Sequence, residues 1–241
     1  MPNTKKLKSI SKEFFEQSVL SKYSYNFSWM SRPIIQYPQD IMAIQEIVWS
    51  VKPDLIIETG IAHGGSLVYS ASMLALIDYC EAKKNGTLID PNFSTRKVIG
   101  VDIDIRDHNR LALDEHPMRH MIELIEGSSI DNKVLQQVIR LSSSYNKVMV
   151  FLDSHHSHDH VLSELELYSD FVTKDSYCVV FDTVIEDLPG NFNEDRPWGP
   201  GNSPKTAVKA FLDKNKNFKI DYTYEDKYII TVAPDGFLKK I

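Results

Sequence analysis

IIETGIAHGGS, residues 56–66, leads from an apolar run through a carboxylate and three glycines into an expected helix. The apolar run predicts a buried strand that brings Glu58 to the edge of a sheet. Gly60 permits a tight turn, and Gly64 and Gly65 would let a ligand approach the backbone N–H groups at the helix start. The pattern is typical of a site for a nucleotide or a nucleoside cofactor, and an ordinary strand-to-helix turn fits it equally well.

Strands and helices alternate along the rest of the chain. Val- and Ile-rich runs without polar alternation predict strands buried on both faces, and apolar residues at helical spacing predict the helices that cover them. Strands are expected at residues 55–57, 98–102, 121–125, 148–153, 177–182, 218–222 and 227–232. Helices are expected at residues 11–20, 40–51, 66–79, 131–141, 160–171 and 204–212. The order predicts an α/β fold with a mostly parallel sheet.

Two polar segments are expected to be loops, at residues 81–96 and 183–203. A loop as long as the second is usually functional, and we expect it to close over an acceptor. Residues 1–38 form an aromatic-rich extension before the expected domain, residues 39–241. Its aromatic side chains are expected to pack on the core, with a substrate pocket or a homo-oligomer interface as alternatives.

Composition indicates an ordinary globular protein. The length of 241 residues suits one α/β domain with a full core, and the net charge of −6 argues against bulk binding to nucleic acid. Two distant cysteines do not predict a disulfide framework, and no apolar run has the length of a membrane span. We therefore expect a cytoplasmic protein with no nucleic-acid partner and no membrane span.

Four of the expected strands end in a carboxylate: Glu58, Asp102, Asp153 and Asp182. Ligands in open α/β sheets bind outside the carboxyl ends of the strands, so these acids should meet at one edge. The glycine spacing lacks both the dinucleotide fingerprint and a P-loop. S-adenosylmethionine needs no phosphate cradle, and carboxylates suit its positive charge and ribose hydroxyls.

Five motifs in this order resemble those of the cephalosporin hydroxylase family. They are ETGIAHGGS at 58–66, GVDID at 100–104, LDSHH at 152–156, FDT at 181–183 and WGPG at 198–201. The resemblance implies a Rossmann-like class I methyltransferase fold, with a mostly parallel seven-stranded sheet, helices on both faces and a final antiparallel strand. It also implies an S-adenosylmethionine-dependent O-methyltransferase, similar to rhamnosyl and macrolide sugar methyltransferases, that acts on a saccharide or small-molecule acceptor.

The resemblance further implies which residues bind the cofactor. Glu58 and Gly60 would line its methionine end, Asp102 would accept the ribose hydroxyls, and Ser128 would lie by the adenine. The rest of the expected set is Gly64, Ser66, Asp104 and Asp153. Two alternatives stay open, because a strand-end acid such as Asp102 can cap the next turn and Ser128 can be a helix N-cap.

A divalent cation, expected to be Mg²⁺, is implied on Asp153 and Asp182. A bound cation lowers the pKa of an oxygen acid, which would help a weakly acidic sugar hydroxyl to lose its proton. His156 matches the family's histidine three residues after Asp153, and these two residues are the expected catalytic pair, with His156 as general base.

Phe181 departs from the family pattern, because many relatives have a glutamate there. One expected acidic ligand is therefore missing, and Thr183, Glu186 and Asp187 are candidates to complete an oxygen shell. Two other functions remain open. The cluster at residues 155–160 nearly matches a zinc-hydrolase signature but has Ser157 at one histidine position. A non-catalytic relative that takes part in polysaccharide assembly is the second.

Overall fold

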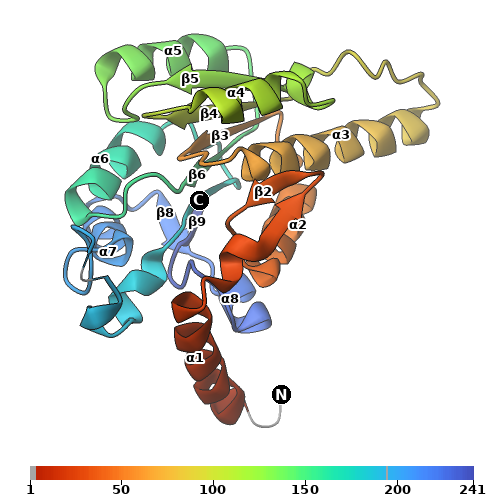
Figure 1. Ribbon diagram of the computed structural model, residues 1–241. Helices are drawn as coiled ribbons and strands as arrows, with labels where there is room; N and C mark the ends of the chain where they lie inside the picture. The colour runs from red at the N-terminus through yellow and green to blue at the C-terminus, as the bar shows by residue number, and fades with distance from the viewer. Residues whose placement is uncertain (1–3, 194) are drawn as a thin grey trace.

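A seven-stranded sheet forms the centre of the computed structural model, which describes residues 4–193 and 195–241 (Figure 1). Its strand order is β5-β4-β3-β6-β7-β9-β8. The first five in this order are parallel: β5 (Ile122–Glu126), β4 (Lys97–Asp102), β3 (Leu55–Thr59), β6 (Val148–Leu152) and β7 (Tyr177–Val180). The last strand of the chain, β9 (Phe237–Lys240), runs antiparallel between β7 and β8 (Phe218–Ile220). The expected α/β fold with a final antiparallel strand is confirmed.

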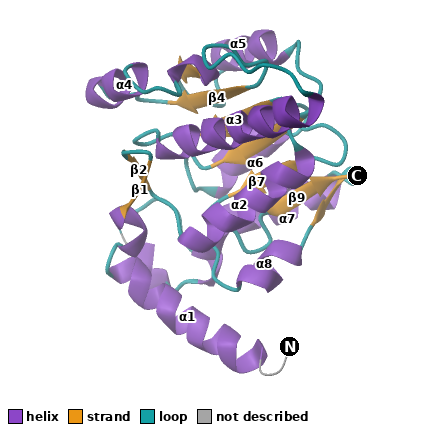
Figure 2. Ribbon diagram, turned by 90° about the vertical axis from the view of Figure 1, so that its right-hand side faces the viewer, coloured by secondary structure: helices purple, strands orange, loops and turns teal. Residues whose placement is uncertain are grey.

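Helices cover both faces of this sheet (Figures 1 and 2). One face packs against α2 (Pro38–Val51), α3 (Gly65–Asn85) and α4 (Asp107–Asp114). The other packs against α5 (Asn132–Ser142), α6 (His158–Tyr168) and α7 (Pro204–Lys214). In the central strand, Ile56 faces the first layer and Leu55 and Ile57 face the second, all fully buried. Burial on both faces explains why β3 has no polar alternation.

The N-terminal segment packs partly on the domain and partly away from it. Helix α1 (Thr4–Leu20) projects from the body of the molecule and ends near a hairpin of β1 (Phe27–Trp29) and β2 (Arg32–Ile34) (Figure 2). Phe15, Ile34 and Tyr37 belong to the same buried core cluster as the sheet. The boundary at residue 38 stays a prediction, because the core continues across it.

Two expectations about the elements were wrong. The expected strand at 227–232 is absent: α8 (Thr223–Tyr228) occupies its start, and Ile229 adopts a positive φ of 67° that breaks an extended path. The expected loop at 81–96 begins later, because α3 continues to Asn85 and ends where Gly86 has a φ of 67°. Glycine reaches this conformation without steric cost, so it terminates the helix.

Four short 3₁₀ helices complete the described elements: η1 (Tyr23–Asn26), η2 (Arg119–Met121), η3 (Thr183–Asp187) and η4 (Gly190–Asn193). The last two lie in the long segment after β7 that was expected to be a loop. Within the described residues, no helix has the length and apolar character that crossing a bilayer requires.

Candidate active site

A cavity of about 460 Å³ opens at the carboxyl ends of β3, β4, β6 and β7. Its first wall is the turn from Gly60 to Ser66, together with Asp102. Asp153, His156 and Asp182 lie in its middle. Its far wall comes from α1 and from the segment after β7, and the side chains there include Phe15, Val19, Leu188, Phe192 and Trp198. The topology thus brings Asp102, Asp153 and Asp182 into one cavity, whereas Glu58, the fourth acid expected there, does not line it.

The glycines of the first wall allow backbone segments to pack closely. A Cβ atom on Gly60, which has a φ of 81°, would lie 2.1 Å from the carbonyl oxygen of Asp153. A Cβ on Gly65 would lie 2.2 Å from the carbonyl oxygen of Pro33 in β2. Gly64 precedes α3 with a φ of 79°, faces Leu113 and does not line the cavity. These glycines are therefore required by the turn and its protein neighbours, apart from any ligand.

Glu58 lies behind this wall rather than on it. Its carboxylate is buried, accepts a hydrogen bond from the Ser66 hydroxyl through Oε1, and has no partner at Oε2. Burial, followed by the charge of Asp102, raises the pKa of Glu58 to about 8. Together with Ser66 and Asp153 it lines a small adjoining cavity of about 20 Å³. Ser66, which lines both cavities, connects Glu58 to the main cavity.

Asp102 caps the glycine turn. Its Oδ2 accepts the backbone N–H of Ile61 at 2.8 Å and that of Ala62 at 3.3 Å, and its Oδ1 accepts the N–H of Asp104 at 3.1 Å. The capping alternative is thus realised, while the carboxylate still lines the cavity. A carboxylate has about four lone-pair positions, so these bonds leave it able to accept a hydroxyl.

Asp104 and Ser128 do not line the cavity. Asp104 is exposed and lies 3.9 Å from Arg106. Ser128 accepts the backbone N–H of Asp131 through its carbonyl oxygen, at 2.9 Å. The N-cap of α5 is Asp131, whose carboxylate accepts the N–H of Lys133 at 2.6 Å, so Ser128 does not have that role.

Asp153, His156 and Asp182 form the centre of the site. One ligand atom from each lies within 4.8 Å of the others, and His156 Nε2 is 3.1 Å from Asp182 Oδ2. Burial and the charges of Asp182 and Glu58 raise the pKa of Asp153 well above its usual range. A cation at this point would oppose both effects.

Gln36 contacts this centre and was not expected from the sequence. Its Nε2 donates to Asp153 Oδ2 at 3.0 Å, and its Oε1 is buried without a partner. Gln36 precedes α2, in the irregular N-terminal segment, where no motif marks it. Only the packing of β2 against Gly65 and the glycine turn brings it to β6.

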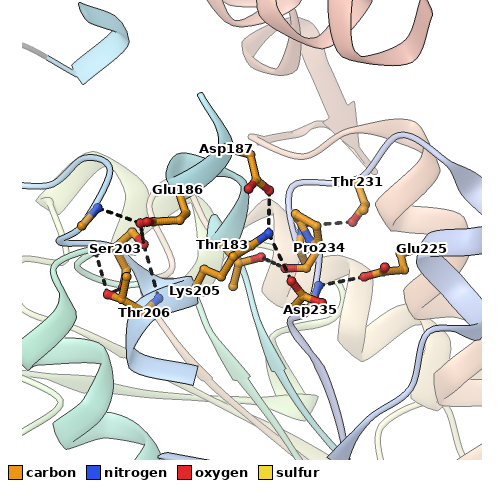
Figure 3. Close-up of polar contacts among 12 residues, drawn as sticks. Thr183, Glu186, Asp187, Ser203, Lys205, Thr206, Glu225, Thr231, Pro234 and Asp235 are labelled. Carbon is orange, nitrogen blue, oxygen red and sulfur yellow. Dashed lines mark hydrogen bonds and ion pairs between the residues drawn. The ribbon is translucent and has the colours of Figure 1, made fainter. Parts of the chain in front are cut away.

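Phe181 and its neighbours contribute no ligand to the centre. The Phe181 ring is buried and packs edge-on against Phe151, with ring centroids 6.1 Å apart. Figure 3 shows the three candidates for an oxygen shell bonded elsewhere. Thr183 donates to the Pro234 carbonyl at 2.6 Å, Glu186 accepts the Ser203 hydroxyl at 2.6 Å, and Asp187 pairs with Lys205 at 2.6 Å. These bonds attach η3 to α7 and to the loop before β9.

The remaining histidines of the 155–160 cluster do not converge on one point. His155 contacts Ser157 Oγ at 2.9 Å, and His158 contacts Thr206 Oγ1 at 2.8 Å. His160 Nε2 lies 3.2 Å from the hydroxyls of both Ser129 and Ser154. The geometry therefore gives the zinc-hydrolase alternative no support.

Trp198 closes the far side of the centre. Its ring packs edge-on against the rings of His155 and His156, at centroid distances of 5.0 and 4.9 Å, and the Arg196 guanidinium lies 5.5 Å from it. An aromatic side chain in this position offers an apolar surface next to the polar centre.

Comparison with known proteins agrees with this geometry. Residues 21–241 match the family model described as rhamnosyl O-methyltransferase/CmcI. A rhamnosyl O-methyltransferase of Mycobacterium tuberculosis is 34% identical over 205 residues, which cover 83% of this chain and 72% of that protein. The Mycobacterium leprae protein of the same name is 30% identical over 218 residues, which cover 88% and 82%.

Solved structures share the fold at low identity. CmcI with Mg and SAM superposes with a TM-score of 0.56 at 16% identity, covering 90% of this chain and 77% of that one. An O-methyltransferase from Bacillus cereus in complex with SAH gives 0.52 at 14% identity, covering 88% and 81%. The chain therefore belongs to the rhamnosyl O-methyltransferase/CmcI family and is an S-adenosylmethionine-dependent O-methyltransferase.

Proposed function

We propose that this enzyme transfers the methyl group of S-adenosylmethionine to a hydroxyl of a sugar or of a glycosylated small molecule, with the help of a divalent cation. One observation carries the proposal: a single cavity joins the glycine turn and Asp102 to the Asp153–His156–Asp182 centre and continues to an apolar far wall. A donor at the first wall and an acceptor at the far wall would meet at the centre. Holding two reactants in this way contributes much of the rate in a displacement reaction.

The cofactor would lie along the first wall. Gly60, Ser66, Asp102 and Asp153 line the cavity, which supports the roles expected for them. Glu58 would act through its hydrogen bond with Ser66. The roles proposed for Gly64, Asp104 and Ser128 have less support, because these residues lie outside the cavity lining.

The residues at the centre fit a divalent cation. Asp153 is partly buried next to other carboxylates, and among the described residues no lysine or arginine forms an ion pair with Asp153 or Asp182. The carboxylates of Asp153 and Asp182 are suitable oxygen donors, and a bound cation would supply the Lewis acidity that makes an acceptor hydroxyl more acidic. Asp153 and His156 remain the proposed catalytic residues, since both would face that hydroxyl.

The far wall supports a sugar acceptor with apolar surface. Phe15, Val19, Leu188 and Phe192 supply apolar contact, and Trp198 lies directly beside His156. The two Mycobacterium relatives are named for rhamnosyl groups, and a deoxysugar has an apolar face that suits such a wall.

Cofactor binding and methyl transfer test the proposal separately. In calorimetric titration, S-adenosylhomocysteine should bind the wild-type protein, and Asp102→Ala should weaken binding about tenfold or more because it removes a cap and a hydroxyl acceptor. Asp90→Ala, in an exposed loop, is the matched control and should bind normally. Labelled S-adenosylmethionine should then methylate rhamnosylated acceptors and not the same acceptors without the sugar. If S-adenosylhomocysteine did not bind the wild-type protein, or if acceptors without the sugar were methylated equally well, the proposal would be contradicted.

Two expectations about the whole protein stay proposals. We propose a cytoplasmic location and self-association through α1, where Leu7, Ile10 and Phe14 are exposed on one side of the helix. Light scattering of the wild-type protein and of Ile10→Ser tests self-association, because it measures the molar mass of each protein in solution. If both proteins had the mass of a monomer, self-association would be contradicted.

A further inference from the structure

The centre of the site has two carboxylates where Mg²⁺ usually finds more oxygen ligands. Phe181, next to Asp182, has an apolar side chain that packs on Phe151. Thr183, Glu186 and Asp187 are bonded to other partners (Figure 3). Among the described residues, the Asp153–His156–Asp182 group is the one set of three possible ligands found close together.

The His156 imidazole is oriented into this centre. His156 follows β6 by four residues, and its Nε2 lies 3.1 Å from Asp182 Oδ2. Trp198 packs edge-on against the ring at 4.9 Å and limits its rotation. Asp182 has a left-handed φ of 56° at the start of η3. The nitrogen that faces Asp182 is therefore the one that could coordinate an ion held by the two carboxylates.

Unpartnered polar atoms around the centre independently indicate a missing ligand. Gln36 is about nine-tenths buried; its Nε2 is bonded to Asp153 while its Oε1 has no partner. Glu58, which lines the adjoining cavity with Asp153, is 2% exposed and has no partner at Oε2 among the described residues. Buried polar atoms are rarely left without a partner, because each costs free energy. Gln36 is the one of these two residues that is bonded to the centre, and a water bound to a cation there would give its Oε1 a partner.

We infer that His156 is the third protein ligand of the cation, and that this nitrogen-containing site prefers Mn²⁺ or Co²⁺ to Mg²⁺. Magnesium is a hard ion that takes oxygen ligands and water, whereas imidazole nitrogen binds the later divalent metals more strongly. Two carboxylates and one imidazole would therefore bind Mn²⁺ and Co²⁺ more tightly than Mg²⁺. Phe181 removes the carboxylate that would favour magnesium.

This role differs from the general base that the sequence predicts for His156. A nitrogen lone pair that coordinates a metal is not available to accept a proton. His156 would then help the acceptor hydroxyl to ionise only by holding the cation in place. The inference rests on the proposed function for the presence of a cation site, and its test requires neither cofactor nor acceptor.

Metal titration of the protein alone tests the inference. Calorimetry with MgCl₂, MnCl₂ and CoCl₂ should give affinities for Mn²⁺ and Co²⁺ that exceed that for Mg²⁺ by about tenfold or more. His156→Gln should lower the affinity for Co²⁺ about tenfold or more and change the visible absorption of bound Co²⁺, with a smaller effect on Mg²⁺. His155→Gln is the matched control, because His155 contacts the same Trp198 ring but lies outside the centre. It should bind all three metals as the wild type does.

The second test supplies a carboxylate oxygen ligand, either beside the His156 nitrogen or in its place. Phe181→Glu would add the missing carboxylate and should raise the affinity for Mg²⁺, but it places a charge at a buried position. His156→Glu makes a similar change at a half-buried position and should reverse the preference towards Mg²⁺ without loss of the circular dichroism signal. A Co²⁺ spectrum and affinity that are unchanged in His156→Gln would overturn the inference. Failure of the proposed function would instead appear as loss of S-adenosylhomocysteine binding.

Discussion

The two walls of the cavity are built in different ways. The first wall is one continuous strand, turn and helix start, held by backbone bonds: the Gly60 N–H donates to the Val101 carbonyl at 2.8 Å, and that of Gly64 donates to the Ile61 carbonyl at 2.6 Å. The far wall combines side chains from α1 with others from beyond residue 183, such as Phe15 and Trp198. Its two parts, α1 and the segment after β7, are far apart in the sequence, so no local turn connects them.

This difference predicts how each wall responds to change. A wall made of backbone has little freedom, because a new atom meets carbonyl groups that cannot move without disturbing the sheet. A wall made of side chains can change its shape and polarity one residue at a time. We therefore expect substitutions in the first wall to affect folding and cofactor binding together, and those in the second to affect the acceptor alone.

Gly60→Ala should have the largest effect. The new methyl group would lie 2.1 Å from the Asp153 carbonyl oxygen at a φ of 81°, and a left-handed alanine that also overpacks should cost roughly 2–5 kcal/mol of unfolding free energy. Urea denaturation measures the loss, and titration with S-adenosylhomocysteine should show weak or no binding.

Gly199→Ala is the matched control, because Gly199 lies next to Trp198 in the segment after β7 that contributes to the far wall. No atom lies within 4 Å of a Cβ built on Gly199, so the stability should change by about 0.5 kcal/mol or less. If the two alanine variants were equally stable, the distinction between the walls would be wrong.

Glu58→Gln should have the next largest effect, and it depends on pH. Burial raises the pKa of Glu58 from 4.5 to about 8. The protonated, uncharged form therefore contributes stability that is fully present below pH 4.5 and is lost as the pH rises towards 8. The free energy of unfolding of the wild type should fall between pH 5 and pH 9 by a few kcal/mol more than that of Glu58→Gln.

Urea denaturation at pH 5, 7 and 9 gives the comparison. Asp40 is present in both proteins and its pKa does not depend on Glu58. The charge of Glu58 raises the pKa of Asp153, so Asp153 adds to the difference in the same direction. Glu166→Gln, on the exposed side of α6, should follow the wild type at each pH. Parallel pH profiles for the wild type and Glu58→Gln would mean that Glu58 is charged in the folded protein.

Sequence periodicity was sufficient for the elements that lie in the middle of the sheet. Residues 148–152 and 177–180 are apolar throughout because both faces are covered, and only a buried strand needs such a run. At the sheet's antiparallel end the same reasoning failed. Ile229, Ile230 and Val232 are apolar, yet the backbone of Ile229 leaves the extended region, whereas β9 contains Lys239 and Lys240 and still pairs with two strands. Tertiary packing, rather than the local sequence pattern, determines which of these segments forms a strand.

The acids of the centre could be predicted for a topological reason. Parallel strands end on the same edge, so Asp102, Asp153 and Asp182 had to lie near one another. Gln36 could not be predicted, because its place depends on how the N-terminal segment packs over the glycine turn. The relation between His156 and Asp182 was also hidden, since a 3.1 Å contact depends on the left-handed backbone of Asp182.

Trp198→Ala should have the smallest effect of the three and should be confined to the acceptor. Removing the ring takes away apolar contact beside His156, so the KM for a rhamnosylated acceptor should rise about tenfold, which corresponds to roughly 1.4 kcal/mol. The affinity for S-adenosylhomocysteine should stay within about twofold of the wild type, because Trp198 lies on the far wall, whereas we propose that the cofactor binds along the first wall. Trp49→Ala, which removes an exposed ring from α2, controls for the loss of a tryptophan. A Trp198→Ala protein that loses cofactor affinity and acceptor affinity together would show that the two walls act as one unit, since a change confined to side chains would then have reached the backbone turn at Gly60.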